Sequence, residues 1–277
     1  MTWRSSATPL AENEVRIYEV KRTDLTDAVV IDGFPSVGLV SSIVANYLID
    51  ALHMEQIGIV DSPAFPTVSL VRGGIPQHPV RIYAGRPKTE RSERGTDKIV
   101  AFVSEFHPAP AVIAPLATAI LDWVQEQRCS LLVSPEGLVA DAPAPAARKG
   151  RGGLGEMKVF GIASTPKARD LYIDPNTIPF TEGVITGIAG VLLNEGRRRG
   201  FDVLTFLAEA SADYPDARAA AKVIETINRI LLHSPLDPVP LYAEAERIER
   251  QLLQIQRRAS ERGRQEPVAA GSQPMYR

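Results

Sequence analysis

Short runs of β-branched and aliphatic residues recur along the chain, and helix-periodic segments lie between several of them. Each run is bounded by glycine, proline or polar residues, which is typical of β-strands. Strands are therefore expected at residues 15–20, 28–34, 57–62, 67–71, 80–85, 98–106, 130–134 and 201–210.

Helical periodicity occupies the intervals between these runs. Val40, Val44 and Leu48 share one helical face directly after Gly38, and a second helix is expected inside residues 110–127. Further helices are expected from Val184 to Arg199 and from Pro215 to Leu232. Strands alternating with helices indicate an α/β fold with a largely parallel sheet that is covered on both faces.

The composition limits the partners and the compartment. A chain of 277 residues, 44% of them hydrophobic, can bury a substantial core, and we expect one domain over residues 15–262. The formal charge of −2, with acids and bases intermixed, favours no nucleic-acid partner. No apolar run approaches the roughly 20 residues that cross a bilayer. The single cysteine, Cys129, cannot form an internal disulfide, so a cytoplasmic location is predicted.

Two segments interrupt the α/β pattern. Residues 141–156 are rich in Pro, Ala and Gly and are predicted to form a mobile surface loop. Residues 263–277, called the tail below, have the composition of a flexible, disordered tether. Between them, residues 238–262 predict a C-terminal helix that either packs on its own sheet or forms a subunit interface. Its apolar seam consists of Leu241, Ala245, Ile248, Leu252, Ile255 and Ala259.

Two glycine-rich segments are candidate phosphate-binding loops. The glycines at 150–155 match G-x-G-x-x-G, but no strand precedes them and a strand-like run follows, which is the reverse of the dinucleotide-binding context. The turn containing Gly33, Ser36 and Gly38 does follow a strand and open a helix, and Ser41 and Ser42 are candidate hydroxyl donors to an anion. The alternative is a tight turn that needs glycine for its backbone angles.

Residues able to carry catalysis or bind metal are scattered. Glu105 and Glu136 lie near strand ends and suit acid/base chemistry, although solvated loop carboxylates fit the same pattern. The four histidines show no metal-ligand spacing, and no second cysteine exists to complete a zinc site. We therefore predict no catalytic residues, no metal and no cofactor. The histidines are His53, His78, His107 and His233.

Four segments, taken in order, resemble the archaeal proteasome-assembly-chaperone family. They are GFPSVGLVSSIVANYLI (33–49), IGIVDSPAFPTVSLVRGG (57–74), GVITGIAGVLLNEGRRRG (183–200) and AEASADYPDARAAAKVIETI (208–227). The resemblance covers roughly residues 15–255. It implies a three-layer α/β/α sandwich similar to nucleoside phosphorylases, homo-oligomerisation and no established catalytic residue.

The chain ends in Met275, Tyr276 and Arg277, which resembles the hydrophobic-Tyr-X tail of proteasome activators. In such tails the terminal carboxylate pairs with a lysine between neighbouring α subunits, while the tyrosine ring supplies rigid contact area. The resemblance thus implies a cytoplasmic homo-oligomer that binds the α ring of the proteasome core particle, as an assembly chaperone or an activator. Two alternatives stay open, namely a small-molecule or nucleotide-binding enzyme using the 33–38 turn, and a scaffold whose 238–262 helix binds another partner.

Overall fold

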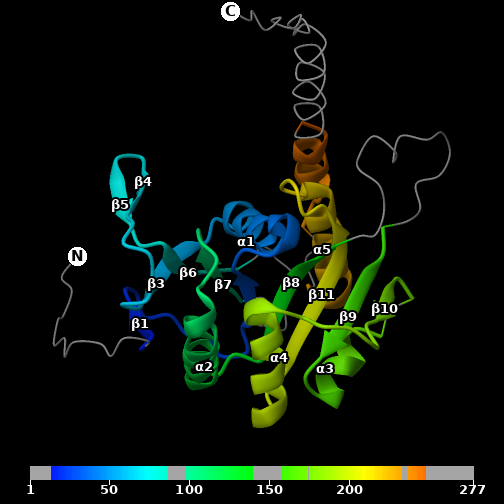
Figure 1. The fold of residues 1–277 in the computed structure, drawn as a ribbon, viewed down its shortest axis with the longest axis horizontal. Helices are drawn as coiled ribbons and strands as arrows, with labels where there is room; N and C mark the ends of the chain where they lie inside the picture. Colours follow the sequence, from blue (N-terminus) through cyan, green and yellow to red (C-terminus); the bar gives the residue numbers. More distant parts are fainter. Residues whose placement is uncertain (1–13, 87–97, 140–156, 174, 233–235, 248–277) are drawn as a thin grey trace, which may run out of the picture.

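A mixed sheet of nine strands forms the middle layer of the protein (Figure 1). The computed structural model describes residues 14–86, 98–139, 157–173, 175–232 and 236–247. The predicted loop at 141–156 and the tail, including Met275, Tyr276 and Arg277, lie outside the described residues. In spatial order the strands are β1 (Arg16–Glu19), β3 (Glu55–Asp61), β6 (Val80–Gly85), β7 (Ile99–Ser104), β2 (Val29–Gly33), β8 (Leu131–Val139), β11 (Val203–Ala210), β9 (Val159–Ala163) and β10 (Thr177–Pro179).

The sheet is less parallel than the sequence pattern predicted. The central strands β7, β2, β8 and β11 are mutually parallel. On one side β7, β6, β3 and β1 pair antiparallel in succession, and on the other β9 pairs antiparallel with β11. The prediction of a largely parallel sheet was wrong at both flanks. The connection from β3 to β6, for example, contains no α-helix, so it lacks the crossover that a parallel pair needs.

Helices cover both faces of the sheet, as predicted. Helices α1 (Val40–Ala51) and α5 (Ala217–Ile230) pack on one face, while α2 (Pro110–Glu126) and α4 (Gly187–Arg199) pack on the other. Alternation along β2 divides the core, since Ile31 belongs to the first cluster and Val30 to the second. Short helical elements complete the described fold, namely the 3-10 turn η1 (Val37–Leu39) and α3 (Pro166–Leu171).

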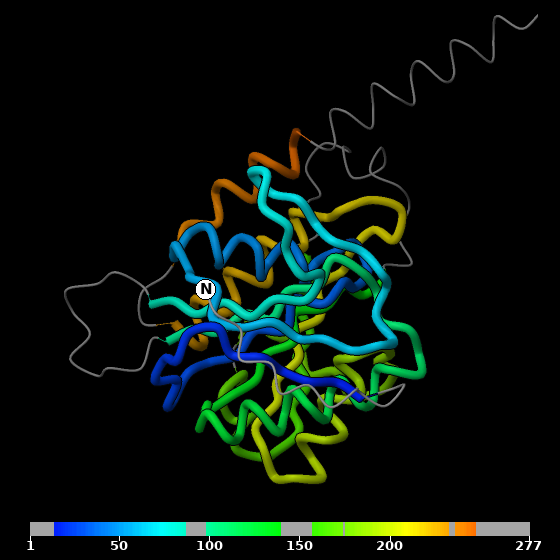
Figure 2. Tube along the Cα trace, turned by 90° about the vertical axis from the view of Figure 1, so that its left-hand side faces the viewer, coloured from blue at the N-terminus to red at the C-terminus, as the bar shows by residue number. Residues whose placement is uncertain are grey.

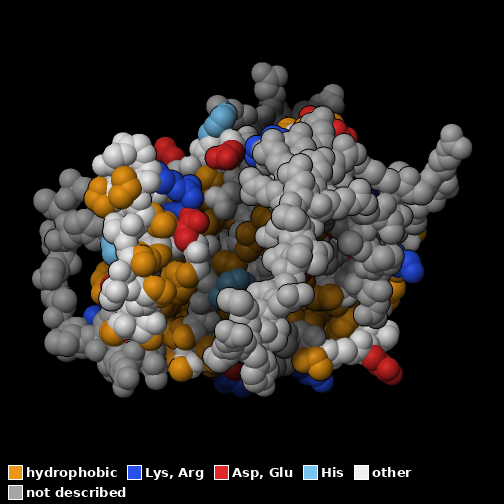
Figure 3. Space-filling model, turned by 45° about the horizontal axis from the view of Figure 1, so that its top comes forward, with side chains coloured by type: hydrophobic (Ala, Val, Ile, Leu, Met, Phe, Trp, Pro, Cys, Tyr) orange, Lys and Arg blue, Asp and Glu red, His pale blue; other side chains and the backbone are white. Residues whose placement is uncertain are grey.

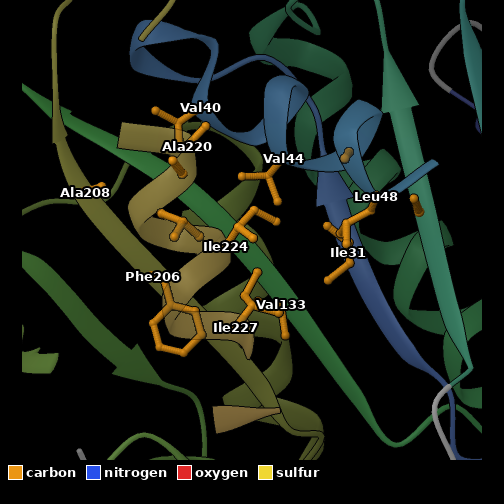
Figure 4. Packing of buried hydrophobic residues seen from close by; sticks show 14 of the residues in the cluster. Ile31, Val40, Val44, Leu48, Val133, Phe206, Ala208, Ala220, Ile224 and Ile227 are labelled. Atoms are coloured by element: carbon orange, nitrogen blue, oxygen red, sulfur yellow. The ribbon is translucent and has the colours of Figure 1, made fainter. Parts of the chain in front are cut away.

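The first core cluster joins α1 and α5 to the central strands (Figure 4). Helical spacings of three and four place the apolar residues of each helix on the face that meets the sheet. The labelled contacts come from Val40, Val44 and Leu48 of α1, from Ala220, Ile224 and Ile227 of α5, and from Ile31, Val133, Phe206 and Ala208 of the strands.

Two predicted helix starts lie too early. Helix α5 begins at Ala217 rather than Pro215, because the Asp216 side chain caps it by accepting a hydrogen bond from the Ala219 amide at 3.0 Å. Helix α4 begins at Gly187 rather than Val184, and Val184 is exposed. Both segments that precede these helices therefore belong to loops at the edge of the sheet.

The segment predicted as a strand at 67–71 instead contributes to a separate hairpin. Strand β4 (Leu70–Arg72) pairs only with β5 (Ile75–Gln77), and together they form a two-stranded sheet that projects from the body (Figures 1 and 2). Gly73 and Gly74 have φ values of 57° and 78° and make the connecting turn. Positive φ at both central residues defines a type I′ turn, which matches the twist of a hairpin.

The chain returns to the body before the tail begins. Residues 239–247 are helical, and Leu241 and Ala245 are buried. Leu241 belongs to the first core cluster, so this part of the predicted 238–262 helix packs on its own domain. The other four positions of the predicted apolar seam lie outside the described residues.

Candidate functional site

A cleft of about 670 Å³ lies at the carboxyl ends of the parallel strands β2, β8 and β11. Open α/β sheets commonly bind ligands at this edge. The walls of the cleft are largely apolar. They consist of residues 35–39 after β2, residues 136–139 of β8, residues 184–188 before and at the start of α4, residues 212–215 after β11, and His107 and Leu207.

The 33–38 turn reaches this cleft, but its two glycines have structural reasons to be there. Ser36 and Gly38 line the cleft, whereas Gly33 is not among its lining residues. A Cβ on Gly33 would approach the Phe102 carbonyl oxygen and the Ala45 Cβ to 2.4 Å. Gly38 combines a φ of 62° with an expected 2.9 Å contact to the Ser211 carbonyl oxygen. These features support the tight-turn interpretation.

The hydroxyl groups expected to serve an anion at this turn are occupied by the backbone. Ser41 Oγ donates to the Phe34 carbonyl oxygen at 2.5 Å, and Ser42 Oγ donates to the Gly33 carbonyl oxygen at 3.4 Å. Ser36 Oγ accepts a hydrogen bond from the Ser41 amide at 3.2 Å. No lysine or arginine is among the described residues that line the cleft. The polar groups of the turn thus stabilise the turn itself.

The sequence analysis missed a buried acid beside the cleft. Asp32 lies in β2, where Oδ2 accepts a hydrogen bond from Ser134 Oγ at 2.6 Å and Oδ1 accepts one from the Phe34 amide at 3.1 Å. Burial raises the pKa of Asp32 to about 6. The available signal was an aspartate inside the apolar run AVVIDGF. A charged residue inside a buried strand is uncommon enough to be noted.

Glu136 occupies the floor of the cleft, as part of β8. Its pKa lies well above the ordinary value, chiefly because of burial and further because of the nearby Asp32 carboxylate. The described part of the chain provides no hydrogen-bond partner for its carboxyl group. The structure thus brings Glu136 next to Asp32, which makes it a candidate proton donor or hydrogen-bonding group toward a molecule in the cleft.

The other sequence candidates are dispersed. Glu105 contacts Arg81 at 2.6 Å and Arg72 at 2.7 Å, and neither Glu105 nor its partners line the cleft. His107 lines the cleft, while His53 and His78 are exposed elsewhere and His233 lies outside the described residues. The described residues contain no group of three or more His, Cys, Asp or Glu side chains suited to a metal ion.

Cys129 is buried directly before β8, and burial raises the pKa of its thiol to about 12. A thiol with such a pKa stays protonated and unreactive at neutral pH. Cys129 is therefore a core residue and not a candidate nucleophile.

Comparison with known proteins places the fold in a family. The model of the PAC2 family matches residues 30–256. The chain belongs to the PAC2 family. An uncharacterized protein, MJ0106 of Methanocaldococcus jannaschii, is 29% identical over 246 residues, which are 88% of this chain and 91% of that protein.

Solved structures resemble this PAC2 chain over most of its length. PbaA of Pyrococcus furiosus, described as an archaeal homolog of proteasome-assembly chaperone, is 29% identical, with a TM-score of 0.75 over 91% of this chain and 95% of that chain. PbaB of the same organism, described as an archaeal proteasome activator, is 22% identical, with a TM-score of 0.73 over 88% of this chain and 99% of that chain. The likeness to PbaB shows a shared fold. The α/β/α architecture expected from the resemblance is confirmed.

None of the helices in the described part of this PAC2 chain is both long enough and apolar enough to span a membrane.

Replacing Asp32 with asparagine in this PAC2 chain is expected to change the pH dependence of stability. The folded-state pKa of about 6 exceeds the ordinary 3.8, so between these values the folded protein binds more protons than the unfolded protein. Stability from this group is therefore full below about pH 4 and falls as the pH rises through about 6. Relative to the wild type, Asp32→Asn should gain about 3 kcal/mol between pH 4 and pH 7.

Urea unfolding at several pH values measures this difference. Glu136→Gln serves as the comparison variant, because Glu136 has a raised pKa but lies in the cleft rather than beside Ser134. Parallel stability curves for Asp32→Asn and the wild type would contradict the prediction.

Replacing Gly33 with alanine is expected to destabilise the protein by about 3 kcal/mol, because the added methyl group overlaps the Phe102 carbonyl oxygen and the Ala45 side chain. Gly73→Ala is the matched control, since a Cβ there meets nothing within 4 Å and only the φ of 57° opposes it. The control should lose about 1 kcal/mol. Equal losses in thermal or urea unfolding would show that close packing does not explain Gly33.

Proposed function

We propose that this chain is a cytoplasmic, homo-oligomeric binding protein that engages the α subunits of the proteasome core particle, as an assembly chaperone or an activator. The observation that carries the proposal is membership of the PAC2 family together with 29% identity to PbaA across most of both chains. The terminal Met275, Tyr276 and Arg277 supply a docking motif of the hydrophobic-Tyr-X type. The proposal requires no catalytic step.

The segment that leads to the tail is tied to the body by polar contacts. The Asn228 side chain binds both backbone groups of Leu236, with Nδ2 donating to the carbonyl oxygen at 2.6 Å and Oδ1 accepting from the amide at 2.9 Å. Tyr47 donates to the Asp237 carbonyl oxygen, and Tyr242 donates to Glu225 at 2.6 Å. These bonds fix the base of the 239–247 helix, which supports the proposal that the chain leaves the body from a defined place.

In the proposed complex each residue of the motif has a separate role. Met275 occupies an apolar patch, Tyr276 packs in the groove between two α subunits, and the Arg277 carboxylate pairs with a lysine. A 15-residue flexible tail has a root-mean-square reach of about 20 Å, which suffices to span from the rim of a ring to a pocket. Several tails on one oligomer raise the effective concentration for each subsequent docking event.

A pull-down with purified core particles tests the proposal. The intact chain is compared with a chain that lacks residues 275–277, and gel filtration of both confirms an unchanged oligomer. Retention of the intact chain and loss of the truncated chain support docking through the motif. Equal retention would exclude the tail mechanism, and failure of both to bind would exclude the partner.

A second candidate function is the binding of a small molecule in the cleft. The unpartnered Glu136 carboxyl group within a 670 Å³ cleft favours it. Calorimetric titration with nucleotides tests it. A heat of binding that is lost in both Ser36→Ala and Glu136→Gln would establish a ligand site.

A further inference from the structure

The β4–β5 hairpin exposes aliphatic side chains that the described residues leave uncovered. Val71 is 69% exposed and Ile75 is 63% exposed, and Val68 just before the hairpin is also exposed. Isolated two-stranded hairpins are marginally stable in water, so an apolar hairpin that stands clear of its body gains from packing against a partner.

An ion-pair network ties the hairpin to the body of the protein. Arg72 contacts Glu105 at 2.7 Å, and Glu105 in turn contacts the buried Arg81 at 2.6 Å. Arg81 also donates to the His78 carbonyl oxygen at 2.8 Å, directly after β5. These contacts tie the tip of β4, through Arg72, and the residue after β5, through the His78 carbonyl oxygen, to the body near the end of β7.

The cleft has an exposed apolar rim of its own. Val184, which lines the cleft, is 83% exposed, and the lining residues Val139 and Leu39 are also exposed. Figure 3 shows hydrophobic side chains gathered on the hairpin, at the left, and again inside the hollow beside it. The molecule thus carries an apolar projection and an apolar hollow that its described residues do not fill.

The projection and the hollow lie at the same edge of the sheet. Strand β3 runs antiparallel to β6, β6 antiparallel to β7, and β7 parallel to β2, so β3 and β2 point the same way. The hairpin connects the end of β3 to the start of β6, while the cleft lies over the ends of β2, β8 and β11. In a two-fold dimer joined through this edge, any contact of a hairpin with a cleft is made twice.

The hairpin carries a cationic donor, and the cleft carries carboxyl groups that can accept hydrogen bonds from it. Residues 68–78 contain Arg72 and no acid. The cleft is lined by Glu136 and Asp213 and, among the described residues, by no lysine or arginine. Arg72 contacts Glu105 through one nitrogen, and a guanidinium group carries five N–H donors, so it can also approach a second carboxylate.

We propose that the β4–β5 hairpin of one copy inserts into the cleft of a second copy, reciprocally about a two-fold axis. Ile75 and Val71 then pack against Val184 and Val139, and Arg72 faces Glu136 and Asp213. Reciprocity doubles the area that one hairpin buries, and stable interfaces bury roughly 1,200–2,000 Å² in total. This inference rests on the homo-oligomer of the proposed function and identifies the surface that forms it.

Disulfide trapping tests the contact directly. Ile75→Cys and Val184→Cys are prepared as separate full-length chains, and the native Cys129 is buried and does not compete. The mixture should form a disulfide-linked dimer under mild oxidation, while each chain alone should not, because only the mixture places a hairpin thiol beside a cleft thiol. A mixture of Ile173→Cys with Val184→Cys is the control, since Ile173 is exposed beside α3.

Sedimentation velocity adds an independent readout. Val71→Asp with Ile75→Asp should raise the dissociation constant of the self-association by about 100-fold, because the cleft would have to desolvate two carboxylates. Val184→Arg should also weaken it, and mixing the hairpin variant with the cleft variant should restore one of the two contacts. Ile173→Asp should have no effect.

The outcomes separate this inference from the proposed function. Absence of the trapped dimer with an unchanged oligomer would overturn the hairpin contact, even if core particles still bind. Loss of the oligomer in Ile173→Asp instead would assign the interface to the α3–β10 edge and overturn the inference. A trapped dimer that fails to bind core particles would support the inference and reject the proposed partner. A chain that stays monomeric and binds nucleotide in the cleft would overturn the inference.

Discussion

Replacing Tyr276 with alanine is expected to lower the apparent affinity of the oligomer for proteasome core particles by about 100-fold. Loss of the ring removes rigid, amphipathic contact area, and one such tail should lose roughly tenfold in binding. When two tails engage together, the losses multiply, because each docking event depends on the same contact. Surface-immobilised core particles and increasing concentrations of the full chain provide the measurement.

Matched variants separate the parts of the motif. Tyr276→Phe keeps the ring and should retain most of the binding, whereas one glycine added after Arg277 displaces the carboxylate and should weaken binding as strongly as Tyr276→Ala. A chain made monomeric should lose avidity while its motif stays intact. Unchanged affinity in both Tyr276→Ala and the glycine-extended chain would remove the tail from the proposed mechanism.

Replacing Glu105 with leucine is expected to lower the free energy of unfolding by about 3 kcal/mol, because it leaves a buried guanidinium without its counter-charge. The Arg81 side chain is only 1% exposed, and its Nη2 lies 2.6 Å from Glu105 Oε1. This loss of unfolding free energy is small for a broken buried ion pair, since the Glu105 side chain is partly exposed to solvent. Urea unfolding measures it.

Two further variants test the cause. Arg81→Met combined with Glu105→Leu should recover part of the loss, because the unpaired charge is then gone. Arg72→Ala removes only the exposed arm of the same network and should cost less than about 1 kcal/mol. A double variant as unstable as the sum of the single variants would show that Arg81 and Glu105 do not act as a pair.

The sequence predicted the elements better than their pairing. Short β-branched runs such as AVVIDGF and the helical spacing of Val40, Val44 and Leu48 are local patterns, and each produced the expected strand or helix. The direction of the flanking strands was missed. The β4–β5 hairpin was missed as well, although the tetrapeptide Arg72-Gly73-Gly74-Ile75 carries a hairpin signal. Helix α5 was predicted to begin at Pro215, but it begins at Ala217 because the Asp216 side chain caps it.

The sequence likewise predicted some residues of the candidate site and missed others. Ser36, Gly38 and Glu136 were singled out from strand ends and turn glycines, and the structure places all three at one cleft. Asp32 was missed because its significance depends on Ser134 and Glu136, which lie about a hundred positions away. The anion-binding interpretation also weakened only when the Ser41 and Ser42 hydroxyls were seen to donate to backbone carbonyls.

By itself, the sequence determined the α/β alternation, the glycine turn after β2, the resemblance to the chaperone family and the Met275-Tyr276-Arg277 motif, because each is written in residues that are neighbours along the chain. Only the tertiary structure decided the order of the strands, the meeting of Asp32 with Ser134 and the separation of Glu105 from the cleft. Those contacts depend on which strands pair across the sheet. That choice is made by the two apolar clusters packing on opposite faces, and no local pattern encodes it.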